Sequence, residues 1–245
     1  MRQVTVIALV ALCAHAAFAE GIRKENVALT TSDGVAISGY FVKGAAPKGP
    51  AVVLLHMLGR TKEDWDPIIE KYLGPETGFC FLAIDLRGHG QSVRQGEKVL
   101  NRKEFSEKDL DDMAGDIGAA VKWLKTRPEV DPDKIGILGA SIAANLALVF
   151  ASQDTTIKAV GLLSPSRNYR GAKTIEAMKA YGKRPVFMAV ASEDMQSVRE
   201  VPWLQKQALG EEMTRVFDGN LHGTRMFAAY PLDKPLTDFL KKHLG

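Results

Sequence analysis

Six short, mainly apolar runs constrain the fold of this chain more than any other feature of its sequence. Each has the length of a strand, and charged, amphipathic stretches separate them. The runs are 51–56, 80–85, 134–139, 157–163, 185–191 and 213–218. Strands without polar alternation are buried on both faces, which is typical of a parallel sheet covered by helices. The sequence therefore predicts an α/β fold with three layers and a mostly parallel central sheet.

An antiparallel hairpin is expected ahead of this sheet. Two β-prone runs, 26–31 and 35–42, are joined by Ser32-Asp33-Gly34, and Asp-Gly is a strong signal for a hairpin turn. Helices are expected between the apolar runs. Apolar residues recur at helical spacing in 110–126, and 141–152 is apolar nearly all round, as in a helix buried against a sheet. Weaker helical patterns cover 174–180, 198–209 and 236–244.

The first 19 residues have the pattern of a secretory signal peptide. Arg2 precedes an apolar run, 4–17, which ends in the small-x-small pattern Ala17-Phe18-Ala19. The run is shorter than the ~20 residues that span a bilayer, so we expect cleavage and not a retained anchor. The expectation is an exported protein, periplasmic or secreted, with 1–19 removed, a single domain over 20–245 and no integral membrane association.

Cysteine usage, charge and motif content narrow the class of protein. Cys13 lies in the predicted signal, so Cys80 is the one mature cysteine and no intramolecular disulfide can form. This pattern fits a bacterial periplasm better than a small disulfide-stapled domain. The formal net charge of +3 falls by one when Arg2 leaves, and we expect no nucleic-acid partner. Because the sequence has neither metal-ligand spacing nor a glycine-rich phosphate loop, we expect no metal and no cofactor.

The segment Gly139-Ala140-Ser141-Ile142-Ala143 lies where an apolar run meets the buried helical segment. A serine on a sharp strand-to-helix turn has its hydroxyl raised above the sheet edge, and small neighbours relieve crowding between strand and helix. Ser141 is therefore the candidate nucleophile. The pattern departs from Gly-x-Ser-x-Gly at its last position, where Ala143 replaces glycine.

Two further residues follow later strands in the chain order that such a site requires. Asp194 comes after the fifth apolar run and His222 after the sixth. Active residues of parallel sheets lie at the carboxyl ends of strands, so these side chains can meet Ser141 at one edge. His222 would take the serine proton, and Asp194 would orient the imidazole. Glu193 is the alternative acid, and a structural loop histidine is the alternative interpretation of His222.

Two further loop segments add to these motifs, and together they show a family resemblance that covers nearly all of Asn26–Gly245. Together with His56-Met57-Leu58-Gly59 and the segment 85–92, the motifs resemble the α/β-hydrolase family, and more narrowly its dienelactone-hydrolase-like and small serine esterase members. The expected oxyanion hole includes the N–H of Ile142, directly after the nucleophile. The family commonly has His-Gly-x in the first loop, and by that match Leu58 supplies the second N–H. Met57 stands where the family has glycine and is the fallback donor.

The motifs and the resemblance predict a serine hydrolase that cleaves a carboxylic ester, or a related acyl bond of a small-molecule substrate, through an acyl-enzyme intermediate. About twenty residues separate the strand that ends near Ser164 from the one that starts near Pro185, so the fold has a minimal cap or none. Peptidase, thioesterase and lactone hydrolase activities on the same residues are alternatives. A catalytically silent binding protein is another. The oligomeric state is left open.

Overall fold

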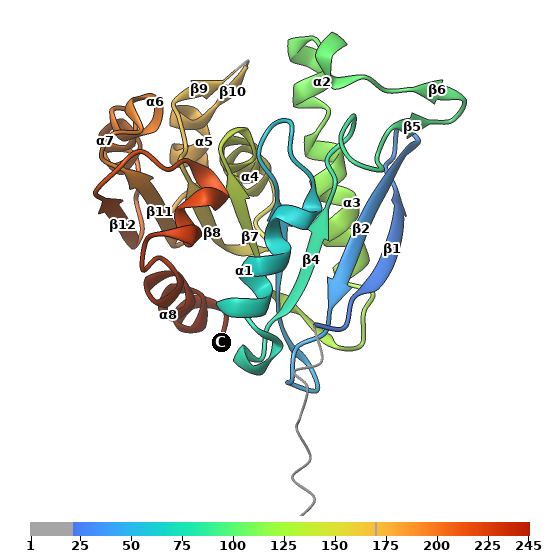
Figure 1. The fold of residues 1–245 in the computed structure, drawn as a ribbon, viewed down its shortest axis with the longest axis horizontal. Helices are drawn as coiled ribbons and strands as arrows, with labels where there is room; N and C mark the ends of the chain where they lie inside the picture. Colours follow the sequence, from blue (N-terminus) through green and yellow to red (C-terminus); the bar gives the residue numbers. More distant parts are fainter. Residues whose placement is uncertain (1–21, 170) are drawn as a thin grey trace, which may run out of the picture.

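Ten strands form one sheet in the computed structural model, which describes residues 22–169 and 171–245 (Figure 1). The predicted signal peptide, 1–19, lies outside the described residues. Along the sheet the order is β12, β11, β8, β7, β3, β4, β2, β5 and β6, and β1 pairs with β2. The strands are β1 (Glu25–Thr30), β2 (Val35–Val42), β3 (Gly49–Leu55), β4 (Cys80–Ile84), β5 (Arg94–Gln95), β6 (Lys98–Val99), β7 (Val130–Ala140), β8 (Ile157–Leu163), β11 (Val186–Ala191) and β12 (Glu212–Phe217).

The six apolar runs are the six parallel strands, so the predicted sheet is confirmed. Strands β12, β11, β8, β7, β3 and β4 pair in parallel, and β2 adds to β4 in the antiparallel sense. The predicted hairpin is β1–β2, with Thr31 and Val35 bonded across the turn and Gly34 at φ 82°. The positive φ explains why the Asp-Gly pair favours this turn.

Helices cover both faces of the sheet. One face carries α3 (Ala114–Leu124), α4 (Ile142–Gln153), α5 (Thr174–Tyr181) and α7 (Val201–Gln205). The other carries α1 (Asp66–Lys71) and α8 (Asp233–Leu244), which lie in front of the sheet in Figure 1. Val53 and Leu55 of β3 pack toward the first set, and Val52 and Leu54 toward the second. Strands β3, β4, β8 and β11 are almost wholly apolar because both of their faces are covered, whereas the edge strand β12 has no buried residue and carries Glu212 and Arg215.

Two predicted helices are each divided in the structure. The segment 110–126 becomes α2 (Glu107–Asp111) and α3, because the backbone tightens to i→i−3 bonds from Met113 to Asp116. The segment 198–209 becomes α6 (Met195–Val198) and α7, and Pro202 in the first turn of α7 has no N–H with which to continue a preceding helix. No helix in the described part of the chain is long and apolar enough to cross a membrane.

The small cap predicted between β8 and β11 consists of α5 and a two-stranded hairpin, β9 (Asn168–Tyr169) with β10 (Ala172–Lys173). In Figure 1 this hairpin and α2 rise from the same edge of the molecule. A Cβ placed on Gly171 of the hairpin would lie 3.7 Å from Asp111 Oδ1 and 3.8 Å from Glu107 Cβ of α2. The hairpin and α2 therefore touch at the edge where the parallel strands end.

Gly139 lets α4 cross close to the end of β7. A Cβ on this residue would lie 2.2 Å from the carbonyl oxygen of Ala143. The glycine that the strand-to-helix turn needs is thus Gly139, two residues before Ser141. Ala143, at the position where the motif departs from glycine, is fully buried with its methyl group in the apolar cluster around α3 and α4.

Gly139→Ala should destabilise the fold by about 1–3 kcal/mol, because the added methyl group meets backbone atoms that cannot move independently. Gly118→Ala in α3 is the matched control, since its Cβ would meet nothing closer than Phe150 Cε2 at 3.5 Å. Alanine is the better helix former, so this variant should gain up to about 1 kcal/mol. Urea unfolding of both proteins measures the difference. Equal stability of the two variants would contradict the packing described for the turn.

Candidate active site

Ser141 lies on a strained turn between β7 and α4. Its φ is 58° and its ψ is −125°, an uncommon conformation for a residue with a side chain that costs on the order of 1–3 kcal/mol. The turn is held by the Ser141 N–H, which donates to the carbonyl oxygen of Leu163 in β8 at 2.8 Å. The side chain is partly exposed at the carboxyl edge of the sheet. This is the placement that the sequence predicted.

Asp194 and His222 form a short hydrogen bond. His222 Nδ1 lies 2.7 Å from Asp194 Oδ2, and the carboxylate is mostly buried while the imidazole is partly exposed. Burial alone would raise the pKa of Asp194, but the hydrogen bond and the charge of His222 outweigh it, so this pKa lies below its ordinary value. An ionised Asp194 holds the proton on Nδ1 of His222. The lone pair of a neutral imidazole is then on Nε2. Glu193, the alternative acid, is exposed.

The loop that carries His222 lies against the turn that carries Ser141. A Cβ on Gly223 would be 3.3 Å from Cβ of Ala140 and 2.4 Å from Sδ of Met57. The residues directly beside Ser141 and His222 are thus close neighbours. The loops that follow β3, β7 and β12 therefore meet at one point of the sheet edge, and Asp194, after β11, bonds His222 there.

Met57 replaces the glycine that the resemblance leads one to expect, and Gly223 accommodates it. The Met57 side chain is buried, and its sulfur occupies the space where a side chain at 223 would lie. Gly223 also has a φ of 58°, which favours glycine. Met57, which replaces the expected glycine in one loop, is therefore accommodated by Gly223 in the facing loop.

Two backbone N–H groups at this edge have no protein acceptor. Neither Leu58 nor Ile142 donates a backbone hydrogen bond to any residue in the described part of the chain. Ile142 is the first residue of α4, where the helix leaves N–H groups unpaired and carries partial positive charge. Both groups are free to bind an oxygen atom that develops negative charge.

His56 fixes the loop that contains Met57 and Leu58. Its Nδ1 donates to the Met57 carbonyl at 2.8 Å, and its Nε2 accepts the Leu86 N–H at 3.1 Å. Burial lowers the pKa of His56, so the imidazole is neutral, as both bonds require. The neighbouring His89 is also buried, which lowers its pKa to about 4, and its Nδ1 donates to the Arg87 carbonyl. These contacts give His56 and His89 structural roles in the two loops.

A buried ion pair anchors the other end of the same loop. Lys62 begins the 3₁₀ helix Lys62–Trp65, and its Nζ lies 2.8 Å from Asp85 Oδ2 at the end of β4. The Lys62 N–H donates to Asp85 Oδ1, also at 2.8 Å. The burial of Lys62 could not be predicted from the sequence, because one lysine in a charged stretch gives no signal of burial.

Ser164 is a second residue whose contacts the sequence did not indicate. It directly follows β8, is buried, and accepts the Gly223 N–H on its Oγ at 2.9 Å. It also contributes to the lowered pKa of Asp194. A single serine after an apolar run is common in sequences, so only the structure distinguishes it.

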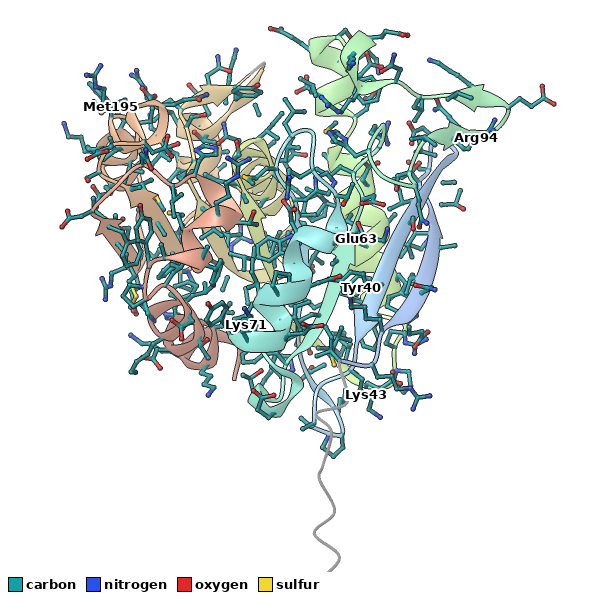
Figure 2. All side chains as sticks on the ribbon, viewed as in Figure 1. Tyr40, Lys43, Glu63, Lys71, Arg94 and Met195 are labelled. Atoms are coloured by element: carbon teal, nitrogen blue, oxygen red, sulfur yellow. The ribbon has the colours of Figure 1, made fainter. Side chains whose placement is uncertain are left out.

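A groove of about 730 Å³ lies beside Asp194. Its lining includes Ser166, Asn168, Lys173, Ile175, Met195 and Arg199. Met195, on α6 and labelled in Figure 2, is half-exposed at the outer rim. Within residues 22–169 and 171–245, no three His, Cys, Asp or Glu side chains are grouped so as to hold a metal ion.

Comparisons with known proteins agree with this architecture. The family model for the dienelactone hydrolase family matches residues 37–223. A thiohydrolase, apmlB, of Arthrinium phaeospermum is 30% identical over 79% of this chain. A polyketide transferase, ATR5, of Stachybotrys chlorohalonatus is 26% identical over 80% of it. This chain covers 59% of the length of the thiohydrolase and 67% of that of the transferase.

Solved structures share the fold at lower sequence identity. An esterase of Pyrococcus furiosus superposes with a TM-score of 0.75 at 22% identity, covering 91% of this chain and 92% of its own. A dienelactone hydrolase of Anabaena variabilis gives a TM-score of 0.74 at 18% identity, covering 92% of this chain and 100% of its own. The α/β-hydrolase fold expected from the sequence is thereby confirmed. By its family match over 37–223, this chain belongs to the dienelactone hydrolase family, a family of α/β-hydrolase enzymes.

Proposed function

We propose that this hydrolase cleaves carboxylic esters of small molecules, with Ser141 as nucleophile, His222 as general base and Asp194 as its orienting acid. The observation that carries the proposal is the 2.7 Å bond between His222 Nδ1 and Asp194 Oδ2, in a loop whose Gly223 lies against Ala140, next to Ser141. This bond leaves Nε2 of His222 available to take a proton. The partly exposed hydroxyl of Ser141 belongs to the turn against which this loop lies.

The proposed reaction proceeds through an acyl-enzyme. His222 Nε2 takes the proton of Ser141 as Oγ attacks the substrate carbonyl carbon, and the carbonyl oxygen becomes an oxyanion. The N–H groups of Ile142 and Leu58 donate to that oxyanion, with Met57 as the fallback donor, and the N-terminal end of α4 adds its positive partial charge. His222 then protonates the leaving alcohol. Water, deprotonated by His222, attacks the acyl-enzyme and releases the acid and Ser141.

Thioester hydrolysis is the second candidate, and the 30% identical thiohydrolase favours it. The same residues can perform it, since only the leaving atom changes from oxygen to sulfur. Substrate pairs that carry one acyl group on an alcohol and on a thiol separate the two functions. A higher kcat/KM for the thiol member would assign thioester hydrolysis. Lactones and aminoacyl amides in the same panel test the lactone hydrolase and peptidase alternatives.

Ser141→Ala should lower kcat for a short p-nitrophenyl ester by roughly 10⁴–10⁶-fold, because the nucleophile is lost. Unfolding in urea should stay close to wild type, since the substitution removes one partly exposed hydroxyl. Ser152→Ala is the matched control, as Ser152 lies on the same helix and bonds only the Val149 carbonyl. A fluorophosphonate should add mass to wild type and to Ser152→Ala but not to Ser141→Ala.

An unlabelled but folded wild-type protein would support the alternative of a silent binding protein. Turnover retained by Ser141→Ala would exclude Ser141 as the nucleophile.

Asp194→Asn should lower kcat on the order of 10⁴-fold, because an amide can donate to Nδ1 and stabilise the wrong tautomer of His222. Glu193→Gln, which changes the adjacent carboxylate, should stay within about threefold of wild type. Steady-state kinetics of both variants with one ester decides between the two acids. The opposite ranking would transfer the role to Glu193.

A further inference from the structure

Leu58 lies inside a tight turn that one backbone hydrogen bond closes. The Arg60 N–H donates to the Met57 carbonyl oxygen at 3.0 Å, and Gly59 has a φ of 75°. These features are typical of a β-turn with glycine at its third residue. Leu58 is the second residue of the turn, and its N–H has no backbone acceptor in the described part of the chain. The direction of this N–H therefore depends on how firmly the two ends of the turn are held.

Side chains hold both ends of the turn. At the first end, His56 Nδ1 donates to the same Met57 carbonyl oxygen at 2.8 Å. At the last end, Arg60 Nε lies 2.9 Å from each carboxylate oxygen of Asp64, and Arg60 Nη2 lies 2.6 Å from Oδ1. Hydrogen bonds from two guanidinium nitrogens to one carboxylate are among the strongest and most directional in proteins. Asp64 is thus the anchor of the last residue of the turn.

Asp64 also reaches the loop that carries the proposed base. It lies in the 3₁₀ helix Lys62–Trp65, and 9% of its side chain is exposed, against 49% of the Arg60 side chain. Thr224, two residues after His222 and buried, donates from Oγ1 to Asp64 Oδ2 at the longer distance of 3.4 Å. The same carboxylate therefore contacts both the turn that contains Leu58 and the loop that contains His222.

We propose that Asp64 is a positioning residue of the active site, and that its carboxylate, by holding Arg60, aims the Leu58 N–H at the oxyanion. The inference rests on the proposed function, in which Leu58 is an oxyanion donor. Asp64 is assigned no contact with the substrate and acts through Arg60. Without it, the last end of the turn is held only by the Arg60 N–H. Because a donor accelerates the reaction only when it points at the transition-state oxygen, the loss should appear in kcat.

The test compares Asp64→Asn with Asp238→Asn in the full chain. Asp64→Asn keeps the size of the side chain and removes the charge and one of the two acceptor oxygens that Arg60 uses. It should lower kcat for a p-nitrophenyl ester roughly 10- to 100-fold with KM within about twofold. Asp238, which pairs with Lys234 on the exposed side of α8, is the matched aspartate, also in an i,i+4 pair. Asp238→Asn should stay within about twofold in both constants. An Asp64→Asn protein with a kcat within twofold of wild type would overturn the proposal.

Arg60→Gln tests the route by which Asp64 acts. Arg60 is half-exposed, so this second variant should fold even if Asp64→Asn folds poorly. If Asp64 acts through Arg60, the double variant should have the kcat of Asp64→Asn alone, because both substitutions break the same link. Effects that multiply in the double variant would show two independent roles and contradict the proposal.

A change of the substrate carbonyl supplies a readout that a general loss of structure would not move. In a thionoester, sulfur replaces the carbonyl oxygen and accepts hydrogen bonds weakly, so the oxyanion donors favour the oxygen ester. A donor that is no longer aimed should slow the oxygen ester more than the thionoester. The ratio of kcat/KM for the two substrates should therefore fall in Asp64→Asn and stay unchanged in Asp238→Asn. An unchanged ratio in Asp64→Asn would overturn the proposal.

A measurement of motion keeps the test independent of the proposed reaction. The NMR order parameter of the Leu58 N–H should fall in Asp64→Asn from about 0.85, as in rigid backbone, toward the values below about 0.6 of flexible segments. It should not change in Asp238→Asn. An inactive wild-type protein that shows this fall would refute the proposed function and retain Asp64 as the anchor of the turn. An active wild type with an unchanged order parameter and kcat in Asp64→Asn would do the reverse.

Discussion

Parallel pairing of β3, β7, β8, β11 and β12 is the constraint on which the rest of the structure depends. It directs the carboxyl ends of strands from distant parts of the chain to one edge of the sheet. A regular set of bonds continues the pairing one residue beyond the strands: Ser141 donates to Leu163, Ser164 to Ala189, and Ser192 to Phe217. Each strand end is thereby tied to its neighbour. The loops that carry the site begin from a rigid edge.

The strain at this edge is supported from both sides of the sheet. Ser141 and Ser164 hold positive φ values at the ends of adjacent strands, and both are bonded through their N–H groups to the next strand. Such conformations persist where surrounding contacts determine them completely. Gly139 contributes by letting α4 approach, and the buried bonds of His56 and Lys62 hold the facing loop. The partly exposed imidazole of His222 is thus bonded to a mostly buried carboxylate, that of Asp194.

Sequence patterns predicted the elements whose signal extends over several residues. The six parallel strands, the first hairpin and the turn at Ser141 all have such signals, and the order of Asp194 and His222 followed from them. The two-residue strands β5, β6, β9 and β10 are too short for a periodicity, and the divisions around Met113 and Pro202 depend on local bonding. Ser164 and Lys62 could not be predicted, because their importance arises from partners distant in the chain.

The contact between Met57 and Gly223 couples the residue choices of two loops, because the Met57 sulfur occupies the space of a side chain at position 223. A protein engineer who grafted a His-Gly-x loop from a relative into this chain would remove the thioether and leave an empty volume beside residue 223. Adding a side chain at 223 instead would collide with the sulfur. An exchange of either loop in this enzyme should therefore change both positions together.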